Sequence, residues 1–284
     1  MDSLTASLVR GAAGSPFKRA GRPGAVLPAD RAVRPAAVPA PAPLARYRAL
    51  CGHPSDGPLP LPYPHVLGFP LAMRLMTARA FPLPVLGLVH TWITLAAHRP
   101  LDPHEPLGLT VYADGLALHR RGTEVTLVTE ARVGGSLVWE SRSGYLARHR
   151  TAPPGADAPA ADDPPHRATA PPAALPARAE WRLPADLGRR YGAVSGDRNP
   201  IHLHPLTARL FGFPRAIAHG MWTVARCLAE NDDPAGVREA RADFRAPVLL
   251  PSTVTYTADP ATGAFALRGG TDGARLHLTG TVRR

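Results

Sequence analysis

A short stretch in the second half of the chain brings together three side chains that could handle a proton. Asp197, Asn199 and His202 supply a carboxylate, an amide and an imidazole close together along the chain. Gly196 and Pro200 interrupt any regular helix here, so the side chains leave a turn rather than one helical face. A carboxylate and a neutral imidazole that converge on one water can orient it and exchange its proton with a substrate.

A second element of the same chemistry follows farther along the chain. His219 and Gly220 open an apolar stretch that predicts a long helix over residues 219–230. The start of a helix offers N–H groups and a favourable dipole to an anion that develops on a carbonyl oxygen. Together with the turn, these are the parts needed to add water across a double bond conjugated to a carbonyl, or to remove it.

Each of these residues also has an ordinary structural interpretation. Asp197 beside Gly196 is typical of a turn or a helix cap, and Asn199-Pro200 is a common turn dipeptide. His219 is equally open to a capping or packing role.

Two other kinds of site were weighed at the same turn. His202 and His204 could ligate a metal together with Asp197, but no further ligand follows at a suitable spacing. Ser195 lacks the G-x-S-x-G surround of a nucleophilic serine. The acid/base interpretation is therefore preferred.

The elements expected to position these groups form two similar halves. The first half has a short helix from residue 44 and a buried helix at 69–81, then strand-like runs at 86–96, 107–112, 116–119, 124–133 and 136–148. The second half has helices at 184–191, 205–211 and 219–230, then strand-like runs at 242–249, 253–258, 264–268 and 275–282. This order predicts an α+β architecture with each helix wrapped by an antiparallel sheet. Two such halves could pair their sheets edge to edge.

Composition divides the chain into four parts. Residues 1–40 predict a flexible basic arm rich in Ala and Pro, with a short extended piece near 32–38. Residues 41–150 and 179–284 are the two domains, joined by a linker rich in Pro, Ala and Asp at 151–178. The formal net charge is +11, and about half of the excess lies in the first 50 residues. The excess positive charge in the rest of the chain favours an anionic ligand.

The sequence also bears on the compartment. Cys51 and Cys227 are the only cysteines and have no zinc-ligand spacing, which favours a reducing cytoplasm without disulfides or a structural metal. The most apolar run, 85–97, contains His90 and is too short to cross a bilayer. The start of the chain lacks the apolar segment of a secretory signal, with an Arg-rich transit peptide as the alternative. We therefore expect a cytoplasmic protein without a membrane partner.

The string YGAVSGDRNPIH, from Tyr191 to His202, closely resembles the signature of the MaoC-like (R)-specific enoyl-CoA hydratases. GFPRAIAHGM, which ends at Met221, resembles the continuation of that signature. The segments FPLPVLGLVH and HRPL resemble the non-catalytic N-terminal half of two-domain members. The resemblance implies a double hot-dog fold, with two helix-wrapped antiparallel sheets in one chain.

The resemblance assigns roles by matching positions. Asp197 and His202 would bind and activate the water, Asn199 would hold the turn, and the Gly220 amide would polarise the thioester carbonyl. Further contacts with the substrate are expected at Ser195, His219 and Met221. The first half lacks the D-x-N-P-x-H motif, so it should be catalytically silent and supply a wall of the acyl tunnel or part of the carrier site.

The implied reaction is the reversible hydration of trans-2-enoyl thioesters to (R)-3-hydroxyacyl thioesters in fatty-acid or polyketide-type metabolism. The carrier would be coenzyme A or an acyl carrier protein, both anionic, and no metal or redox cofactor is implied. One alternative is a catalytically inert thioester-binding or scaffold protein on the same fold. Another is a nucleic-acid-binding protein that uses the basic arm, although no reading motif is present. The acyl chain length, the reaction direction and association into a homodimer are left open.

Overall fold

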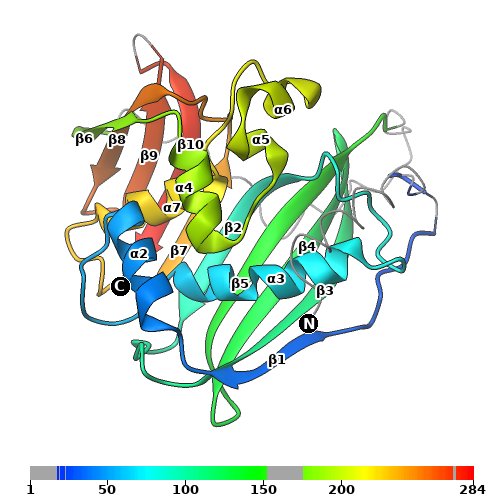
Figure 1. The fold of residues 1–284 in the computed structure, drawn as a ribbon, viewed down its shortest axis with the longest axis horizontal. Coiled ribbons are helices and arrows are strands. Elements are labelled where there is room, and N and C mark those ends of the chain that lie inside the picture. The colour runs from blue at the N-terminus through cyan, green and yellow to red at the C-terminus, as the bar shows by residue number, and fades with distance from the viewer. Residues whose placement is uncertain (1–17, 19, 23, 152–174, 271–272) are drawn as a thin grey trace.

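The protein is described here by a computed structural model, which covers residues 18, 20–22, 24–151, 175–270 and 273–284. The described residues form one antiparallel sheet of ten strands in the order β1-β3-β4-β5-β2-β7-β10-β9-β8-β6. Helix α3 lies across the strands of the first half, and helix α7 lies against those of the second (Figure 1). The predicted α+β architecture is confirmed.

The first half contains seven of the named elements. They are β1 (Ala32–Ala37), α2 (Pro41–Cys51), α3 (Tyr63–Thr77), β2 (Val89–Ala97), β3 (Leu107–His119), β4 (Gly122–Val133) and β5 (Ser136–Arg148). Burial along β3 follows the alternation of a strand with one covered face, since Leu107, Leu109 and Val111 are completely buried. These side chains form the core beneath α3.

The second half contains the remaining elements. They are β6 (Ala177–Leu183), α4 (Leu187–Ser195), α5 (Pro200–Leu203), α6 (Pro205–Leu210), α7 (Gly220–Ala229), β7 (Glu239–Phe244), β8 (Ser252–Asp259), β9 (Ala264–Gly269) and β10 (Arg275–Arg283). Helix α7 buries an apolar face that includes Val224, Ala225 and Leu228. Because α7 is anchored in this core, its first residues have a fixed position.

The two halves share one sheet through β2 and β7. These strands pair antiparallel, from Trp92 opposite Asp243 to Ala96 opposite Glu239. Trp222 of α7 adds a link to the first half, because its indole N–H donates to the Leu50 carbonyl at 3.1 Å. The expected pairing of the two halves edge to edge is therefore confirmed.

Some element boundaries differ from the sequence prediction. The prediction of a helix bounded by Pro70 and Pro82 is wrong at its start, because α3 begins at Tyr63 and passes through Pro70. Pro70 is exposed, so its ring faces solvent, and burial of the opposite face offsets the hydrogen bond that proline cannot donate. The runs 107–112 and 116–119 form one strand, β3, with an irregularity between Ala113 and Gly115.

The predicted division into four parts stays a prediction. The extended piece expected near 32–38 is confirmed as β1, which pairs with β3 at one end of the sheet. Strand β6 begins at Ala177, inside the predicted linker. Residues 1–17 of the predicted arm and 152–174 of the linker lie outside the described residues.

Two further findings concern the bulk properties. Within the described part of the chain, no helix combines the length and the apolar character that crossing a membrane requires. Cys51 and Cys227 are both buried free thiols.

Candidate active site

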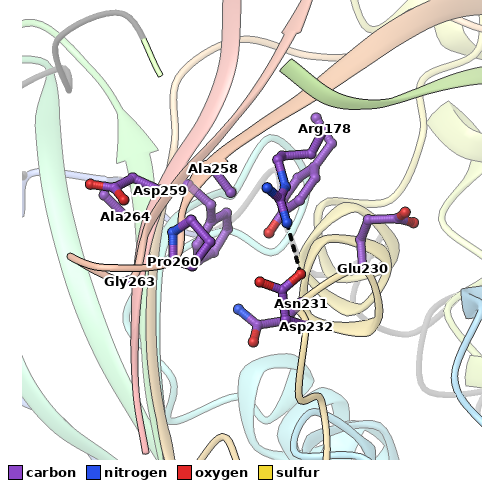
Figure 2. A pocket seen from close by; sticks show the side chains of 11 residues that line it. Arg178, Glu230, Asn231, Asp232, Ala258, Asp259, Pro260, Gly263 and Ala264 are labelled. Carbon is purple, nitrogen blue, oxygen red and sulfur yellow. Dashed lines mark hydrogen bonds and ion pairs between the residues drawn. The ribbon is translucent and has the colours of Figure 1, made fainter. Parts of the chain in front are cut away.

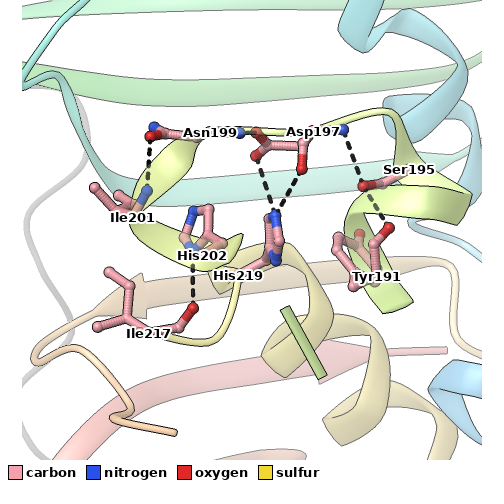
Figure 3. Close-up of polar contacts among 8 residues, drawn as sticks. All are labelled: Tyr191, Ser195, Asp197, Asn199, Ile201, His202, Ile217 and His219. Atoms are coloured by element: carbon pink, nitrogen blue, oxygen red, sulfur yellow. Dashed lines mark hydrogen bonds and ion pairs between the residues drawn. The ribbon is translucent and has the colours of Figure 1, made fainter. Parts of the chain in front are cut away.

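The turn between α4 and α5 is built by residues that stop one helix and start the next. Gly196 ends α4 with φ 79°, a left-handed conformation that glycine adopts without strain. Asn199 then caps α5, since its side-chain oxygen accepts from the Ile201 N–H at 3.3 Å, and Pro200 occupies the first position of that helix. Asp197 lies between these two signals, on the turn itself (Figure 3).

Hydrogen bonds inside the turn fix the direction of Asp197. The Ser195 hydroxyl donates to the Tyr191 carbonyl at 2.8 Å and accepts from the Asp197 N–H at 3.2 Å. One carboxylate oxygen of Asp197 accepts from the Asn199 N–H at 3.1 Å. Ser195 and Asn199 therefore support the turn through their contacts with its backbone.

His202 lies on α5 with a defined ring orientation. Its Nδ1 is 2.8 Å from the Ile217 carbonyl oxygen, which can only accept, so Nδ1 carries the hydrogen. The Nε2 lone pair is then the basic position of the ring. The side chain is buried at 9% exposure, whereas Asp197 retains 26%, so the carboxylate is the more accessible member of the pair.

His219 lies next to both of these side chains, at the start of α7 (Figure 3). Its Nε2 is 2.9 Å from the Asp197 backbone oxygen and 3.8 Å from a carboxylate oxygen of the same residue. Its ring stacks on His202, with centroids 3.7 Å apart and planes 25° apart. The side chain is only 2% exposed, so it contacts the pair from the interior side.

Among the residues that the structure describes, Asp197, His202 and His219 are also the one group that could hold a metal, with their donor atoms within 4.8 Å of one another. The His219 Nε2 already donates to the Asp197 carbonyl, so a metal at that nitrogen would displace this hydrogen bond. His204, the other histidine of the motif, caps α6 instead, because its Nδ1 accepts from the Leu206 N–H. The donor set thus suits proton transfer better than ligation.

The surroundings shift the proton affinities of the three groups. Burial raises the pKa of Asp197, although the nearby His202 and the Asn199 N–H oppose that shift. Burial lowers the pKa of His202, against the opposing effects of Asp197 and the Ile217 carbonyl. Burial also lowers the pKa of His219 well below its usual value, and His202 adds to that effect. Both rings are therefore neutral at neutral pH.

Gly220 begins α7 beside this cluster, where the first N–H groups of a helix have no partner within the helix. A Cβ at this position would lie 2.8 Å from a ring carbon of Phe244 at the end of β7. Only glycine fits here without moving the ring. Met221 is half-buried against the core.

The first half also contributes side chains next to Phe244, which sequence reasoning did not identify. The His90 ring packs between Tyr145 and Phe244, with centroid distances of 4.6 Å and 4.8 Å. Burial and the charge of Asp197 raise the pKa of Tyr145. The one signal in the sequence was His90 itself, a histidine inside the most apolar run of the chain.

Tyr191 is a second residue that the motif did not single out. Its ring centroid lies 4.9 Å from that of His219, and its side chain is almost completely buried. Tyr191 therefore packs against His219 in the interior beside the acid/base pair.

Two hollows elsewhere in the molecule lack comparable chemistry. Figure 2 shows one near the end of α7, where Arg178 and Asp232 neutralise each other at 2.9 Å. Its volume, about 10 Å³, is enough for little more than one water. The other has a volume of about 190 Å³ and lies between the loop at 53–61 and residues 97–101 and 234–238. There Arg48 donates to the carbonyls of four loop residues, and Arg99 pairs with Glu105.

Comparison with known proteins identifies the relatives of the chain. Residues 167–261 match the family described as "MaoC like domain". The chain is 40% identical over 247 residues to 3-hydroxyacyl-thioester dehydratase X of Mycobacterium tuberculosis, covering 86% of this chain and 85% of that protein. It superimposes on the crystal structure of HtdX of the same organism with a TM-score of 0.74 and 34% identity, covering 89% and 99% of the two chains.

A more distant structure bears on the fold alone. A second M. tuberculosis protein, described as having a double hotdog fold, matches with a TM-score of 0.55 at 16% identity and covers 88% of this chain and 94% of its own. The predicted double hot-dog fold is confirmed.

Proposed function

The chain belongs to the MaoC-like dehydratase family, and from that premise we propose that it interconverts trans-2-enoyl thioesters and (R)-3-hydroxyacyl thioesters. It is a hydro-lyase of fatty-acid metabolism, and its relative of 40% identity is named a 3-hydroxyacyl-thioester dehydratase. The observation that carries the proposal is the convergence of the Asp197 carboxylate, the His202 imidazole and the start of α7.

In the hydration direction, Asp197 and His202 hold one water molecule. The water donates hydrogen bonds to the His202 Nε2 lone pair and to the carboxylate. One of its two protons passes to this pair as the water oxygen forms a bond to C3 of the enoyl group. The electron pair of the double bond moves through C2 toward the thioester carbonyl. The C2 carbon then takes a proton back from the pair, which leaves both residues as they began.

The negative charge that develops on the thioester oxygen needs a donor aimed at it. We assign this role to the Gly220 N–H at the start of α7. The partial positive charge at the N-terminus of a helix favours an anion there. Fixed donors of this kind typically contribute on the order of 3 kcal/mol to lowering the barrier. These proton transfers need no metal or redox cofactor.

The remaining residues of the motif act through the pair. Ser195 and Asn199 maintain the turn through the hydrogen bonds described above. His219 holds the Asp197 carbonyl and supports the His202 ring. Substrate contact by Met221, and by Ser195 or His219, stays a prediction.

The proposal is tested by mixing the protein with crotonyl-CoA and longer 2-enoyl-CoAs and following the loss of enoyl absorbance. We expect turnover, with the product in the (R) configuration. Carrier-protein thioesters are the second substrate set. Absence of turnover with both sets would contradict the proposal and favour an inert thioester-binding protein.

A further inference from the structure

Helix α6 turns an apolar face to solvent. Leu206 is 62% exposed, Leu210 83% and Phe211 39%. Leu206 and Leu210 are four residues apart and so lie on one side of the helix, while Ala208 on the other side is fully buried and seats the helix on the body. We call Leu206, Leu210 and Phe211 the α6 face. Figure 1 shows α6 at the outer edge of the molecule, projecting beyond α5.

The chain around the α6 face carries only positive charge. No Asp or Glu occurs from Arg198 to Ala229. Arg209 within α6 and Arg215, four residues after Phe211, are both exposed. Each donates to a backbone carbonyl, Arg209 to Pro214 at 3.3 Å and Arg215 to Pro251 at 2.9 Å, which orients the guanidinium without cancelling its charge. An apolar centre with a cationic rim favours an acidic protein surface.

The α6 face is also close to the proposed chemistry. Helix α5, which carries His202, is followed directly by α6. The Thr207 hydroxyl ties the two helices together by donating to the Pro200 carbonyl at 2.6 Å. A partner bound to α6 would therefore lie one short helix away from the Asp197 turn.

We propose that the α6 face is the docking surface for an acidic acyl carrier protein that presents the thioester substrate. This inference rests on the proposed function and adds to it the choice of carrier. A convex helix face with three large apolar side chains matches a protein surface, whereas a nucleotide such as that of coenzyme A is held in a cleft. A second copy of a chain with net charge +11 would bring like charges together at this surface.

The test compares two substrates that share the crotonyl group and differ in the carrier, crotonyl acyl carrier protein and crotonyl-CoA. We expect Leu210→Ser and Arg209→Glu each to lower kcat/KM for the carrier-protein thioester by roughly tenfold, as loss of an interface anchor does. The kcat/KM for crotonyl-CoA should be unchanged, which also shows that the variants fold. The effect of Arg209→Glu should shrink as salt is raised.

Matched control variants change the same residue types elsewhere. Val33, 56% exposed on β1, is replaced by Ser, and Arg74, exposed on α3, is replaced by Glu. Both should leave the two substrates unaffected. Equal losses with both substrates in the α6 variants, or no loss with the carrier-protein thioester, would overturn the docking surface. A third result would also overturn it: the chain self-associates, Leu210→Ser abolishes this self-association, and turnover of the carrier-protein thioester is unchanged.

Binding of the unloaded carrier protein separates this inference from the reaction itself. Calorimetric titration with the holo-carrier should show binding that Leu210→Ser weakens by about the same factor. If neither thioester is turned over, the proposed function fails, yet binding that depends on the α6 face would still support docking. Absence of binding together with turnover of both thioesters would reject docking alone.

Discussion

The His219 ring donates a hydrogen bond to the Asp197 backbone carbonyl across 2.9 Å, so the start of α7 is fastened to the turn that carries the carboxylate. The same ring supports His202 by stacking at 3.7 Å. Because α7 is anchored in the core of the second half, this one histidine ties both members of the acid/base pair to a helix with a buried apolar face.

Replacing Asp197 with Asn or His202 with Ala should abolish most turnover while leaving the fold intact. Each variant removes a proton-transfer group, a change that costs on the order of 10²- to 10⁴-fold in rate. The measurement is enoyl absorbance with crotonyl-CoA, combined with thermal unfolding of each variant. His204→Asn is the matched control, because it alters a nearby histidine and keeps a side chain that can cap α6. Near-full activity in both variants would contradict the assignment of Asp197 and His202 as the acid/base pair.

Replacing His219 should lower kcat much more than it raises KM. His219→Leu removes the donor to the Asp197 carbonyl, and a misplacement of about 1 Å at the pair can cost on the order of 10²-fold. His219→Gln retains an N–H donor and should recover part of the loss. Steady-state kinetics of both variants provide the test. A change confined to KM would instead indicate direct contact with the substrate, as the sequence motif suggested.

Activity should fall on the acidic side of neutrality. The reaction needs His202 neutral and Asp197 ionised; the pKa of His202 is lowered from 6.5 and that of Asp197 is raised from 3.8. Because the pKa of Asp197 is raised, the loss of kcat/KM on the acid side should be centred above pH 3.8. A pH profile with crotonyl-CoA checks this. An acidic limb centred at or below pH 3.8 would contradict the raised pKa of Asp197 and assign the titration to another group.

Acid should also destabilise the first half. Burial lowers the pKa of His65 to about 4 and that of His90 to about 3. The unfolded chain then binds more protons below pH 6.5, so the stability that the neutral rings provide is present above 6.5 and is lost as the pH falls toward 3. His90→Phe retains stacking on Tyr145 without a titrating group, and its Tm should fall less steeply with acid. Parallel Tm curves for both proteins would contradict the assignment.

Gly188→Ala should reduce stability and activity together. A Cβ on Gly188 would lie 1.9 Å from the His202 carbonyl oxygen, so α4 would have to move away from α5. Replacing glycine by alanine at an exposed helix position normally raises the free energy of unfolding by about 1 kcal/mol. The expected effect of Gly188→Ala on stability is therefore opposite in sign to the effect of helix propensity. Thermal unfolding and crotonyl-CoA turnover give the two readouts, with Arg190→Ala on the exposed side of α4 as the control. An unchanged or higher Tm would show that the helices have room to separate.

The acid/base turn could be predicted because its signals are local. Gly196, Pro200 and the three polar side chains lie within a few residues, and each acts on its neighbours through backbone conformation or capping. The place of His219 beside Asp197 depends on the chain returning through α5 and α6, which no local pattern specifies. A capping or packing role and a role in the site therefore looked alike in the sequence.

The fold class could also be predicted from local patterns, but the pairing of the strands could not. Period-two and helical patterns report each element, but which strand pairs with which is a long-range choice. The pairing of β2 with β7 brings His90 and Tyr145 beside Phe244, so the contribution of the first half to the site emerges only in three dimensions. Pro70 is the opposite case. Locally it predicts the start of a helix, but burial of the surrounding residues of α3 outweighs this effect and the helix continues through it.

The shared sheet has a consequence for how the protein behaves when it is scarce. Strands β2 and β7 meet within one chain, so each edge faces its partner at an effective concentration that dilution does not lower. Two separate subunits joined at the same edges would dissociate as their concentration fell, and Phe244 would lose the cover that His90 gives it. In this chain the specific activity should therefore be independent of enzyme concentration.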